Sequence, residues 1–236
     1  MTSAPRRGAG KAAVLFDVDG TLVDSSYLHT LAWWQAFRQA GYEVPMADIH
    51  RLIGMGGDRI LSKLLPAERD TTEDSTIMSS HAAVFSTFWP ALRPLEGARE
   101  LLAACHDGGL AVALASSARE RDLEVLRTTI GADAFIDAAT SSADAKESKP
   151  APDILVAALR AVDVLASDAV YVGDAVWDIY AARELGIPAI GLTCGGTGEA
   201  ELRDAGAVEV YSSPRALLEN LAGSAIGQLA ARTRRS

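Results

Sequence analysis

The sequence predicts an α/β protein in which helices cover both faces of a parallel sheet and a small helical domain is inserted into the chain. Three observations lead to this prediction. A short apolar run at Ala12–Phe16 ends abruptly in an acidic, glycine-containing loop, as a buried strand does. No convincing strand pattern occurs between Tyr27 and Trp89. After Pro94 strand and helix patterns alternate, which is typical of a parallel sheet.

The helices of the insertion are predicted from apolar residues at helical spacing and from the glycine or proline that ends each pattern. An insertion of roughly 65 residues is long enough to be a small domain. The expected helices cover Leu28–Phe37, Met46–Ile53, Arg59–Leu65 and Glu73–Phe88.

The remainder of the chain is predicted to form the sheet and its covering helices, because short uncharged strands indicate a sheet that is buried on both faces. The expected strands after Ala12–Phe16 are Leu110–Ala115, Ala134–Ala139, Ala169–Val172, Pro188–Leu192 and Val208–Tyr211. The expected helices are Gly97–His106, Arg119–Ile130, Pro152–Ala161, Val176–Leu185, Glu199–Ala205 and Pro214–Leu221. The predicted core therefore consists of residues 12–24 and 92–222, the helical domain of residues 25–91, and the flexible termini of residues 1–11 and 223–236.

Length and composition limit the class of protein. The 236 residues are 49% apolar, which suits one globular domain that carries a smaller one. The 22 Lys and Arg against 31 Asp and Glu give a net charge of −9, which disfavours nucleic-acid binding. No apolar run approaches the roughly 18 residues that a membrane span needs. Residues 1–11 lack the apolar stretch of a secretory signal, and two cysteines cannot form a disulfide scaffold, so we expect a cytoplasmic monomer or homodimer.

Polar residues follow the predicted strands where those strands end. The carboxyl ends of parallel strands meet at one edge of a sheet, where ligands bind. Three carboxylates, a hydroxyl and an ammonium are therefore expected to converge there. These residues are Asp17 and Asp19 after the first strand, Ser116 after Leu110–Ala115, Lys149 before the helix at Pro152, and Asp174 after Ala169–Val172, with Asp178 one turn later.

This combination of residues suits metal-assisted phosphoryl transfer. Carboxylate oxygens are ligands that Mg²⁺ prefers, and a lysine among them makes sense if an anion lies beside the metal. One carboxylate can attack phosphorus to form an aspartyl-phosphate. A second, two residues away, can protonate the leaving oxygen and then activate water. The acidic net charge does not exclude a phosphate ester, because a bound magnesium ion reverses the local sign of the charge.

These residues resemble the motifs of the haloacid-dehalogenase-like hydrolases. Asp17-Val18-Asp19-Gly20-Thr21 resembles the first motif, Ser116 the second and Lys149 the third. Gly173-Asp174-Ala175-Val176-Trp177-Asp178 resembles the fourth, and the order of the motifs is the same. The similarity extends over residues 12–221. The helical insertion lies where members of the phosphoglycolate-phosphatase and β-phosphoglucomutase branch carry a helical cap.

The resemblance implies a Rossmann-like core, a helical cap domain and a Mg²⁺-dependent phosphatase of a small phosphorylated metabolite, such as phosphoglycolate or a sugar phosphate. Asp17 would be the nucleophile and a metal ligand. Asp19 would be the general acid and base, with its main-chain carbonyl on the metal. Asp174 would complete the magnesium site, and Asp178 would order it.

The resemblance also implies the residues that contact the substrate. Ser116 and Lys149 would hold the transferring phosphoryl group. In the cap, His29 and Arg59 are candidate substrate contacts, because mutases of this branch have a histidine near the position of His29. The arginine that those mutases carry in the cap loop has no clear match, since Gly56-Gly57 occupies that region and Arg59 is displaced.

Each motif also has a purely structural interpretation. Asp19-Gly20 is a common turn dipeptide, Ser116 fits a helix cap, and Lys149 fits a solvated surface. Their common position at strand ends favours the functional interpretation. Two other functions remain open: a sugar-phosphate mutase, and a non-catalytic phospho-acceptor similar to a response-regulator receiver. A receiver has about half this length and no insertion, and a lasting aspartyl-phosphate has no use for an acid/base beside it.

Overall fold

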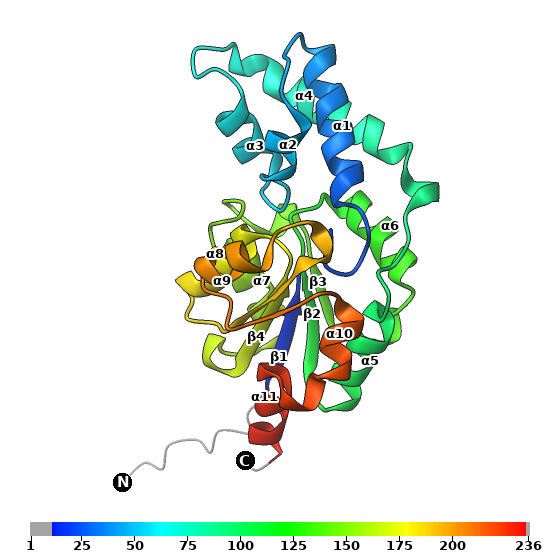
Figure 1. Ribbon diagram of the computed structural model, residues 1–236, viewed down its shortest axis with the longest axis vertical. Coiled ribbons are helices and arrows are strands. Elements are labelled where there is room, and N and C mark those ends of the chain that lie inside the picture. The colour runs from blue at the N-terminus through cyan, green and yellow to red at the C-terminus, as the bar shows by residue number, and fades with distance from the viewer. Residues whose placement is uncertain (1–10, 235–236) are drawn as a thin grey trace.

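The computed structural model describes residues 11–234, and a six-stranded parallel sheet lies at the centre of this part of the chain (Figure 1). The strand order is β3-β2-β1-β4-β5-β6. The predicted α/β fold is therefore confirmed. The strands are β1 (Ala13–Phe16), β2 (Ala111–Ala115), β3 (Ala138–Thr140), β4 (Ala169–Gly173), β5 (Ala189–Leu192) and β6 (Glu209–Tyr211).

The central strand β1 is apolar along its whole length because both faces of the sheet are covered there. It pairs with β2 on one side and β4 on the other. Its residues are fully buried, and they alternate between two apolar clusters. Val14 and Phe16 belong to one cluster, whereas Ala13 and Leu15 belong to the other. A strand buried on both faces loses the polar–apolar alternation of a half-exposed strand.

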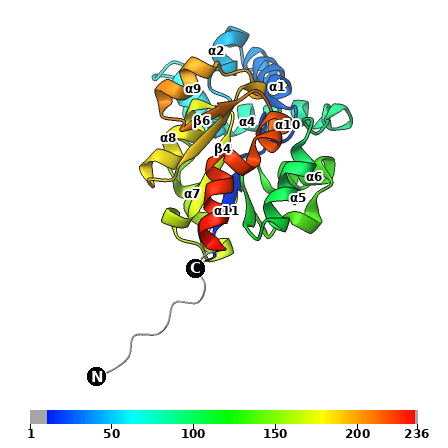
Figure 2. The same ribbon diagram turned by 60° about the horizontal axis from the view of Figure 1, so that its bottom comes forward.

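Helices cover the two faces of the sheet (Figures 1 and 2). One face packs on α5 (Ala98–Asp107), α6 (Glu120–Ile130), α10 (Pro214–Glu219) and α11 (Ala225–Thr233). The opposite face packs on α7 (Asp153–Val162), α8 (Val176–Glu184) and α9 (Glu199–Ala205).

The segment between β1 and α5 is helical and lies beyond the carboxyl ends of the strands (Figure 1). Most of its buried apolar residues form a third cluster, with Trp33, Phe37, Ile49 and Leu61 among its members. Ala32 and Phe85 belong instead to one of the two clusters that flank the sheet. The helices are α1 (Ser26–Gln39), α2 (Met46–His50), α3 (Gly57–Leu64) and α4 (Asp74–Ser86).

The chain enters and leaves this helical insertion at adjacent points. The Asp24 N–H donates to the Arg93 carbonyl at 3.0 Å, and the Leu95 N–H donates to the Leu22 carbonyl at 2.9 Å. Val23 and Pro94 form an antiparallel bridge between the two connections. The two crossing segments therefore form a short paired ribbon below the insertion.

The prediction of a flexible segment over residues 223–236 is wrong for its described part. Ala225–Thr233 forms α11, and Ile226 and Leu229 are buried against the sheet. The Ser224 hydroxyl accepts a hydrogen bond from the Gly227 N–H at 3.4 Å and so caps the helix. The many small residues of this segment weaken its apolar pattern. Residues 1–10 and 235–236, which complete the predicted flexible termini, lie outside the described residues.

The prediction of a strand over Ala134–Ala139 is wrong in its first half. Asp133–Phe135 forms a 3₁₀ turn, and β3 begins only at Ala138. The Asp137 carboxylate accepts a hydrogen bond from the Val112 N–H of β2 at 2.8 Å. A side chain therefore binds this backbone N–H just before the residue pairs of β2 and β3 begin. β3 is consequently a short edge strand.

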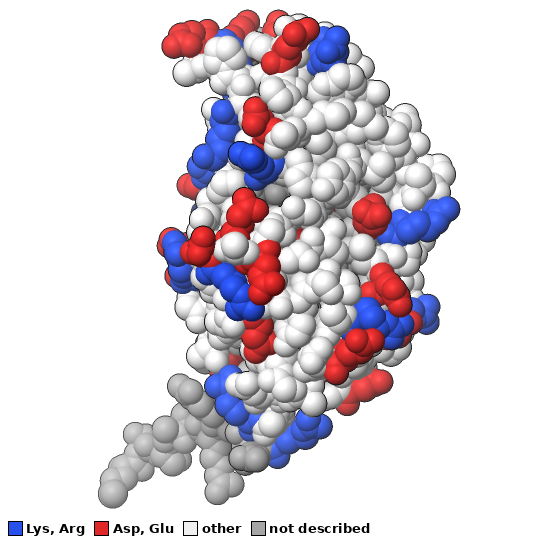
Figure 3. Space-filling view, in the orientation of Figure 1, with Lys and Arg blue, Asp and Glu red and all other residues white. Residues whose placement is uncertain are grey.

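Charged side chains of both signs are interspersed over the face of the described residues that Figure 3 shows, with no continuous basic band there. In residues 11–234 no helix is both long enough and apolar enough to cross a membrane.

Candidate active site

A buried lysine between two carboxylates forms the centre of the site. Asp17 follows β1 directly, and its Oδ1 lies 2.5 Å from Lys149 Nζ. The same Nζ lies 2.8 Å from Asp178 Oδ1. Tyr171, on the neighbouring strand β4, donates a hydrogen bond from its hydroxyl to Asp178 Oδ1 at 2.9 Å. Asp178 is thus an anchor for Lys149, one helical turn into α8.

The site carries more negative charge than Lys149 alone can balance. Burial raises the pKa of Asp17 to about 8, although the Lys149 ammonium opposes this shift. Burial, together with the charges of Asp178 and Asp17, raises the pKa of Asp174 well above its usual range. Burial lowers the pKa of Lys149, but Asp17 and Asp178 outweigh this effect and raise it above its ordinary value. A further cation at this place would relieve the excess of buried negative charge.

The carboxylates are arranged as oxygen donors for such a cation. Asp17, Asp174 and Asp178 each offer an oxygen, and these oxygens lie within 4.8 Å of one another. Asp17 Oδ2 is buried and has no hydrogen-bond partner among residues 11–234. Thr21 donates to Asp174 Oδ1 at 2.9 Å and so orients this carboxylate. An all-oxygen donor set with an unused buried oxygen fits a hard divalent cation such as Mg²⁺.

A glycine is required beside the Asp174 carboxylate. Gly20 has a φ of +77°, which favours glycine, and a Cβ there would overlap Ser26 Oγ and Asp174 Oδ2. A Cβ at Gly195 would also overlap Asp174 Oδ2. The glycine in the Asp19-Gly20 pair therefore keeps the space around Asp174 open, in addition to forming a turn.

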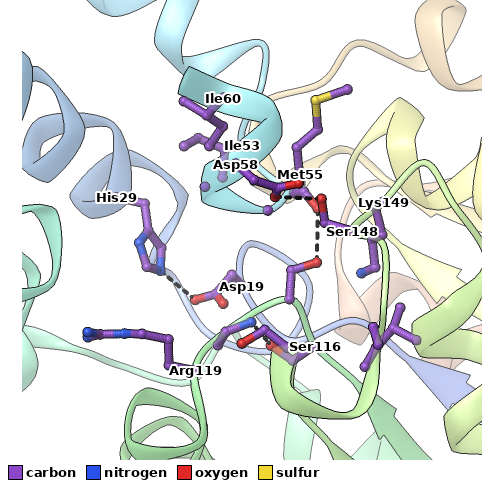
Figure 4. A pocket seen from close by; sticks show the side chains of 18 of the residues that line it. Asp19, His29, Ile53, Met55, Asp58, Ile60, Ser116, Arg119, Ser148 and Lys149 are labelled. Carbon is purple, nitrogen blue, oxygen red and sulfur yellow. Dashed lines mark hydrogen bonds and ion pairs between the residues drawn. The ribbon is translucent and has the colours of Figure 1, made fainter. Parts of the chain in front are cut away.

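Asp19 points toward His29 of the helical insertion (Figure 4). Its Oδ1 accepts a hydrogen bond from Ser25 Oγ at 2.5 Å and lies 3.1 Å from His29 Nε2. Burial raises the pKa of Asp19, but the charge and hydrogen bond of His29 and the hydrogen bond of Ser25 outweigh burial and hold the pKa below its usual value. The two carboxylates of the first motif are therefore in different environments, which suits two different chemical roles.

A cavity of about 300 Å³ brings most of the predicted site residues together (Figure 4). Asp17, Asp19, Ser116 and Lys149 line it from the sheet side, and His29 lines it from α1. The Ser116 hydroxyl accepts a hydrogen bond from the Ala118 N–H at 3.0 Å, which fixes its orientation. The cavity therefore places carboxylates, an ammonium and a hydroxyl around one space.

The structure does not bring every predicted residue to this cavity. Arg59 is not among the described residues that line it, because its guanidinium is turned to Glu147 at 2.6 Å on the core. Asp174 lines a second cavity, which lies between α1, α2 and the start of α8. Asp178 lies behind Lys149 and contacts the cavity only through it.

Comparison with known protein families agrees with this geometry. Residues 14–192 match the family model described as haloacid dehalogenase-like hydrolase. The chain belongs to the haloacid dehalogenase-like hydrolase family. A hydrolase from Pseudomonas syringae superposes with a TM-score of 0.86 at 30% identity, and the match covers 90% of this chain and 99% of that one.

Two relatives illustrate the range of proteins that this hydrolase resembles. It is 32% identical over 202 residues to SUPPRESSOR OF QUENCHING 1, chloroplastic, from Arabidopsis thaliana, and the match covers 83% of this chain but only 19% of that longer protein. It is 29% identical over 181 residues to a phosphoglycolate phosphatase from Nitrosospira multiformis, covering 74% of this chain and 79% of the relative. The second likeness confirms the predicted branch of the family.

Several residues of the hydrolase's site were not predicted from its sequence. Tyr171 lies within an apolar strand, where nothing marks it as the partner of Asp178. His81 lies on α4, and its Nε2 approaches His29 Nδ1 at 3.2 Å. Asp122 lines the cavity from α6. Its place in the first turn of the helix that follows the strand end at Ser116 is a signal that sequence reasoning could have used.

His81 gives the hydrolase a predictable dependence of stability on pH. Burial, then the positive charges of His29 on α1 and Arg119 at the start of α6, lower the pKa of His81 well below 6.5. The folded protein therefore binds this proton more weakly than the unfolded chain does. The associated stability is present above pH 6.5 and is lost as the pH falls below that value.

The unfolding free energy of the unmodified protein is expected to fall between pH 7.5 and pH 5.5. In His81→Gln this fall should be smaller. Urea denaturation at both pH values measures it. His106 provides the matched control, because its side chain is 42% exposed, and His106→Gln should follow the pH profile of the unmodified protein. A His81→Gln profile parallel to that of the unmodified protein would contradict the prediction.

Proposed function

We propose that the protein is a Mg²⁺-dependent phosphatase that hydrolyses a small phosphorylated metabolite through an aspartyl-phosphate on Asp17. The observation that carries the proposal is the buried, unpartnered Oδ2 of Asp17, in a carboxylate whose other oxygen lies 2.5 Å from Lys149 Nζ. A free carboxylate oxygen beside a fixed ammonium is the arrangement that a phosphorus nucleophile needs, because the ammonium attracts the phosphoryl dianion. Membership of the hydrolase family and a relative named phosphoglycolate phosphatase support it.

The reaction divides into two displacements. In the first, Asp17 attacks phosphorus, the bond from phosphorus to the leaving oxygen breaks, and Asp19 donates its proton to that oxygen. In the second, Asp19 accepts a proton from water while the water oxygen attacks phosphorus, which releases inorganic phosphate and restores Asp17. A magnesium ion held by Asp17 and Asp174 would supply positive charge to the phosphoryl oxygens.

Asp19 must carry a proton in the first displacement, although His29 and Ser25 hold its pKa below the usual value. A bound phosphoryl dianion is a like charge, and like charges raise the pKa of a carboxyl group. Substrate binding therefore favours the acid form of Asp19. Loss of the leaving group then returns Asp19 to the base that the second displacement requires.

The helical insertion acts in this proposal as a cap that selects the substrate and excludes water. It contacts the core at the cavity and also beyond it. Ser148 of the core donates to Asp58 of α3 at 2.8 Å, and Trp177 of the core donates to the Arg51 carbonyl at 3.0 Å. Closure over a reacting phosphoryl group strengthens the electrostatic interactions within the site.

Phosphate release from a panel of monophosphates, with Mg²⁺ and then with a chelator, tests the proposal. We expect repeated turnover that the chelator abolishes and that added Mg²⁺ restores. Failure to release phosphate from any member of the panel in the presence of Mg²⁺ would contradict it. A sugar-phosphate mutase would instead interconvert hexose-phosphate isomers with little phosphate release, and a receiver-like module would accept one phosphoryl group without turnover.

Asp19→Asn is expected to slow turnover by about 10²- to 10⁴-fold, the usual contribution of general acid–base catalysis. Its affinity for Mg²⁺ should stay unchanged, because the Asp19 side chain faces Ser25 and His29 rather than the carboxylate cluster. Steady-state kinetics and calorimetric titration with Mg²⁺ measure the two effects. Asp24→Asn, at an exposed acid on the same loop, is the matched control. Unchanged turnover in Asp19→Asn would remove its acid/base role.

A further inference from the structure

The wall of the cavity contains an ion pair, with a buried carboxylate and a half-exposed guanidinium, that the proposed reaction does not use. Arg119 Nε and Nη2 both donate to Asp122 Oδ2, at 2.9 and 2.8 Å. Both residues line the cavity, and the Asp122 side chain is only 5% exposed whereas that of Arg119 is 53% exposed. Two hydrogen bonds to one buried oxygen hold the guanidinium in place and neutralise its charge.

The other oxygen of Asp122 has no such partner. Asp122 Oδ1 is buried and accepts no hydrogen bond from any residue in the described part of the chain. An ionised carboxylate only accepts hydrogen bonds, so a ligand group that satisfies Oδ1 must be a donor. Leaving a buried charged acceptor unsatisfied is unfavourable, which gives a hydroxyl group of the substrate a reason to bind there.

The remaining walls of the cavity carry little net charge. Lys146 and Asp58 also line it, but they are exposed and opposite in sign, so solvent screens them. The ring of His81 stacks on Trp33 with 4.1 Å between centroids, and its lowered pKa keeps it neutral at pH 7. Apolar side chains complete the wall on the insertion side: Trp33, Ile53, Met55, Ile60 and Met78. Ile53, Met55 and Ile60 are labelled in Figure 4.

We propose that Asp122 is a specificity-determining residue that selects phosphate monoesters of neutral, hydroxyl-bearing leaving groups, such as polyols and sugars, over esters whose leaving group carries a second anion. Asp122 does so in two ways. It occupies Arg119, a cation in the cavity wall that would otherwise be free to bind a second phosphate or carboxylate, and it offers Oδ1 to a hydroxyl. The apolar wall then packs against the carbon skeleton of the leaving group. The inference rests on the proposed phosphatase activity and narrows its substrate class.

A substrate comparison on the unmodified protein is the first test. Glycerol phosphate and hexose monophosphates represent neutral leaving groups, whereas phosphoglycolate and phosphoglycerate carry a second anion. We expect kcat/KM with Mg²⁺ to be at least about tenfold higher for the better neutral substrates, the change that one charged hydrogen bond supplies. A preference for the anionic leaving groups would overturn the inference.

Asp122→Asn is the second test, because it removes the charge while keeping the shape. It should raise the ratio of kcat/KM for phosphoglycolate over glycerol phosphate by about tenfold or more, since Arg119 becomes free to bind the second anion. Adding Arg119→Gln to this variant should return the ratio toward that of the unmodified protein. If the pair had a purely structural role, kcat/KM would fall equally for both substrates and their ratio would stay unchanged. This result would overturn the inference.

Asp133→Asn is the matched control. Asp133 pairs with Arg127 at 3.0 Å at the far end of the same helix, and its side chain is 59% exposed. This variant should leave the substrate ratio unchanged. If the Asp122 variants do not fold, the comparison on the unmodified protein still decides the question. Absence of phosphate release from every substrate would instead refute the proposed phosphatase activity itself.

Discussion

Replacing Asp17 with Asn is expected to abolish phosphate release, with a loss of at least about 10⁴-fold, in the range found when a covalent nucleophile is removed. The amide oxygen is a poor nucleophile and cannot form an aspartyl-phosphate. The fold should tolerate the change. Asn has the shape of Asp, and Asp178 still pairs with Lys149 Nζ at 2.8 Å. The Asn side-chain oxygen can still accept the hydrogen bond from Lys149.

A discontinuous assay for inorganic phosphate with Mg²⁺ measures the activity, and urea denaturation confirms that the variant is folded. Asp24→Asn serves again as the control at an exposed acid of the same loop. An Asp17→Asn protein that is folded and releases phosphate at a rate comparable to that of the unmodified protein would exclude Asp17 as the nucleophile.

Lys149→Ala is expected to cause the largest loss of stability, about 3–5 kcal/mol, the cost of removing one partner from a buried ion pair. The Lys149 side chain is fully buried between Asp17 and Asp178. Its removal leaves two carboxylates facing each other with no compensating charge. Activity should be lost as well, because no ammonium remains to attract the phosphoryl group.

The unfolding free energy from urea denaturation, with and without Mg²⁺, measures this effect. Mg²⁺ should recover part of the stability, because a cation that binds the folded carboxylates shifts the equilibrium toward the folded state. Lys146→Ala, three residues earlier and exposed, is the matched control, and its unfolding free energy should stay close to that of the unmodified protein. Equal stabilities for the two lysine variants would show that Lys149 is not essential to the buried charge balance.

The positions of Asp17, Ser116 and Lys149 could be predicted because they depend on topology. Parallel strands end at one edge of the sheet, so residues that are distant in sequence meet there whatever the details of packing. The separation of Asp174 from the substrate cavity could not be predicted in this way. It depends on the direction of a single side chain, which Thr21 sets from a different loop.

The parts of the site that the helical insertion contributes were harder to predict. The charge of Arg59 and its place in the chain suggest a substrate contact, but its guanidinium pairs with Glu147. His81 faces the cavity because α4 packs against α1, and no local pattern records the contact between two helices that are distant in sequence. Asp122 lies on the core helix α6 instead. Its position after β2 can be read from the sequence, but its unsatisfied oxygen depends on the packing of the whole fold.

The paired ribbon at Val23 and Pro94 has a consequence for how such an enzyme diversifies. The two connections between the sheet and the helical segment lie next to each other. Another segment of different length can therefore replace the helical segment without moving any strand. Such an exchange is not chemically neutral, however. Ser25 and His29, which hold Asp19, come from the start of this same segment. A replacement segment must therefore supply new partners for Asp19. A change of this segment is thus expected to alter substrate preference and reaction rate together.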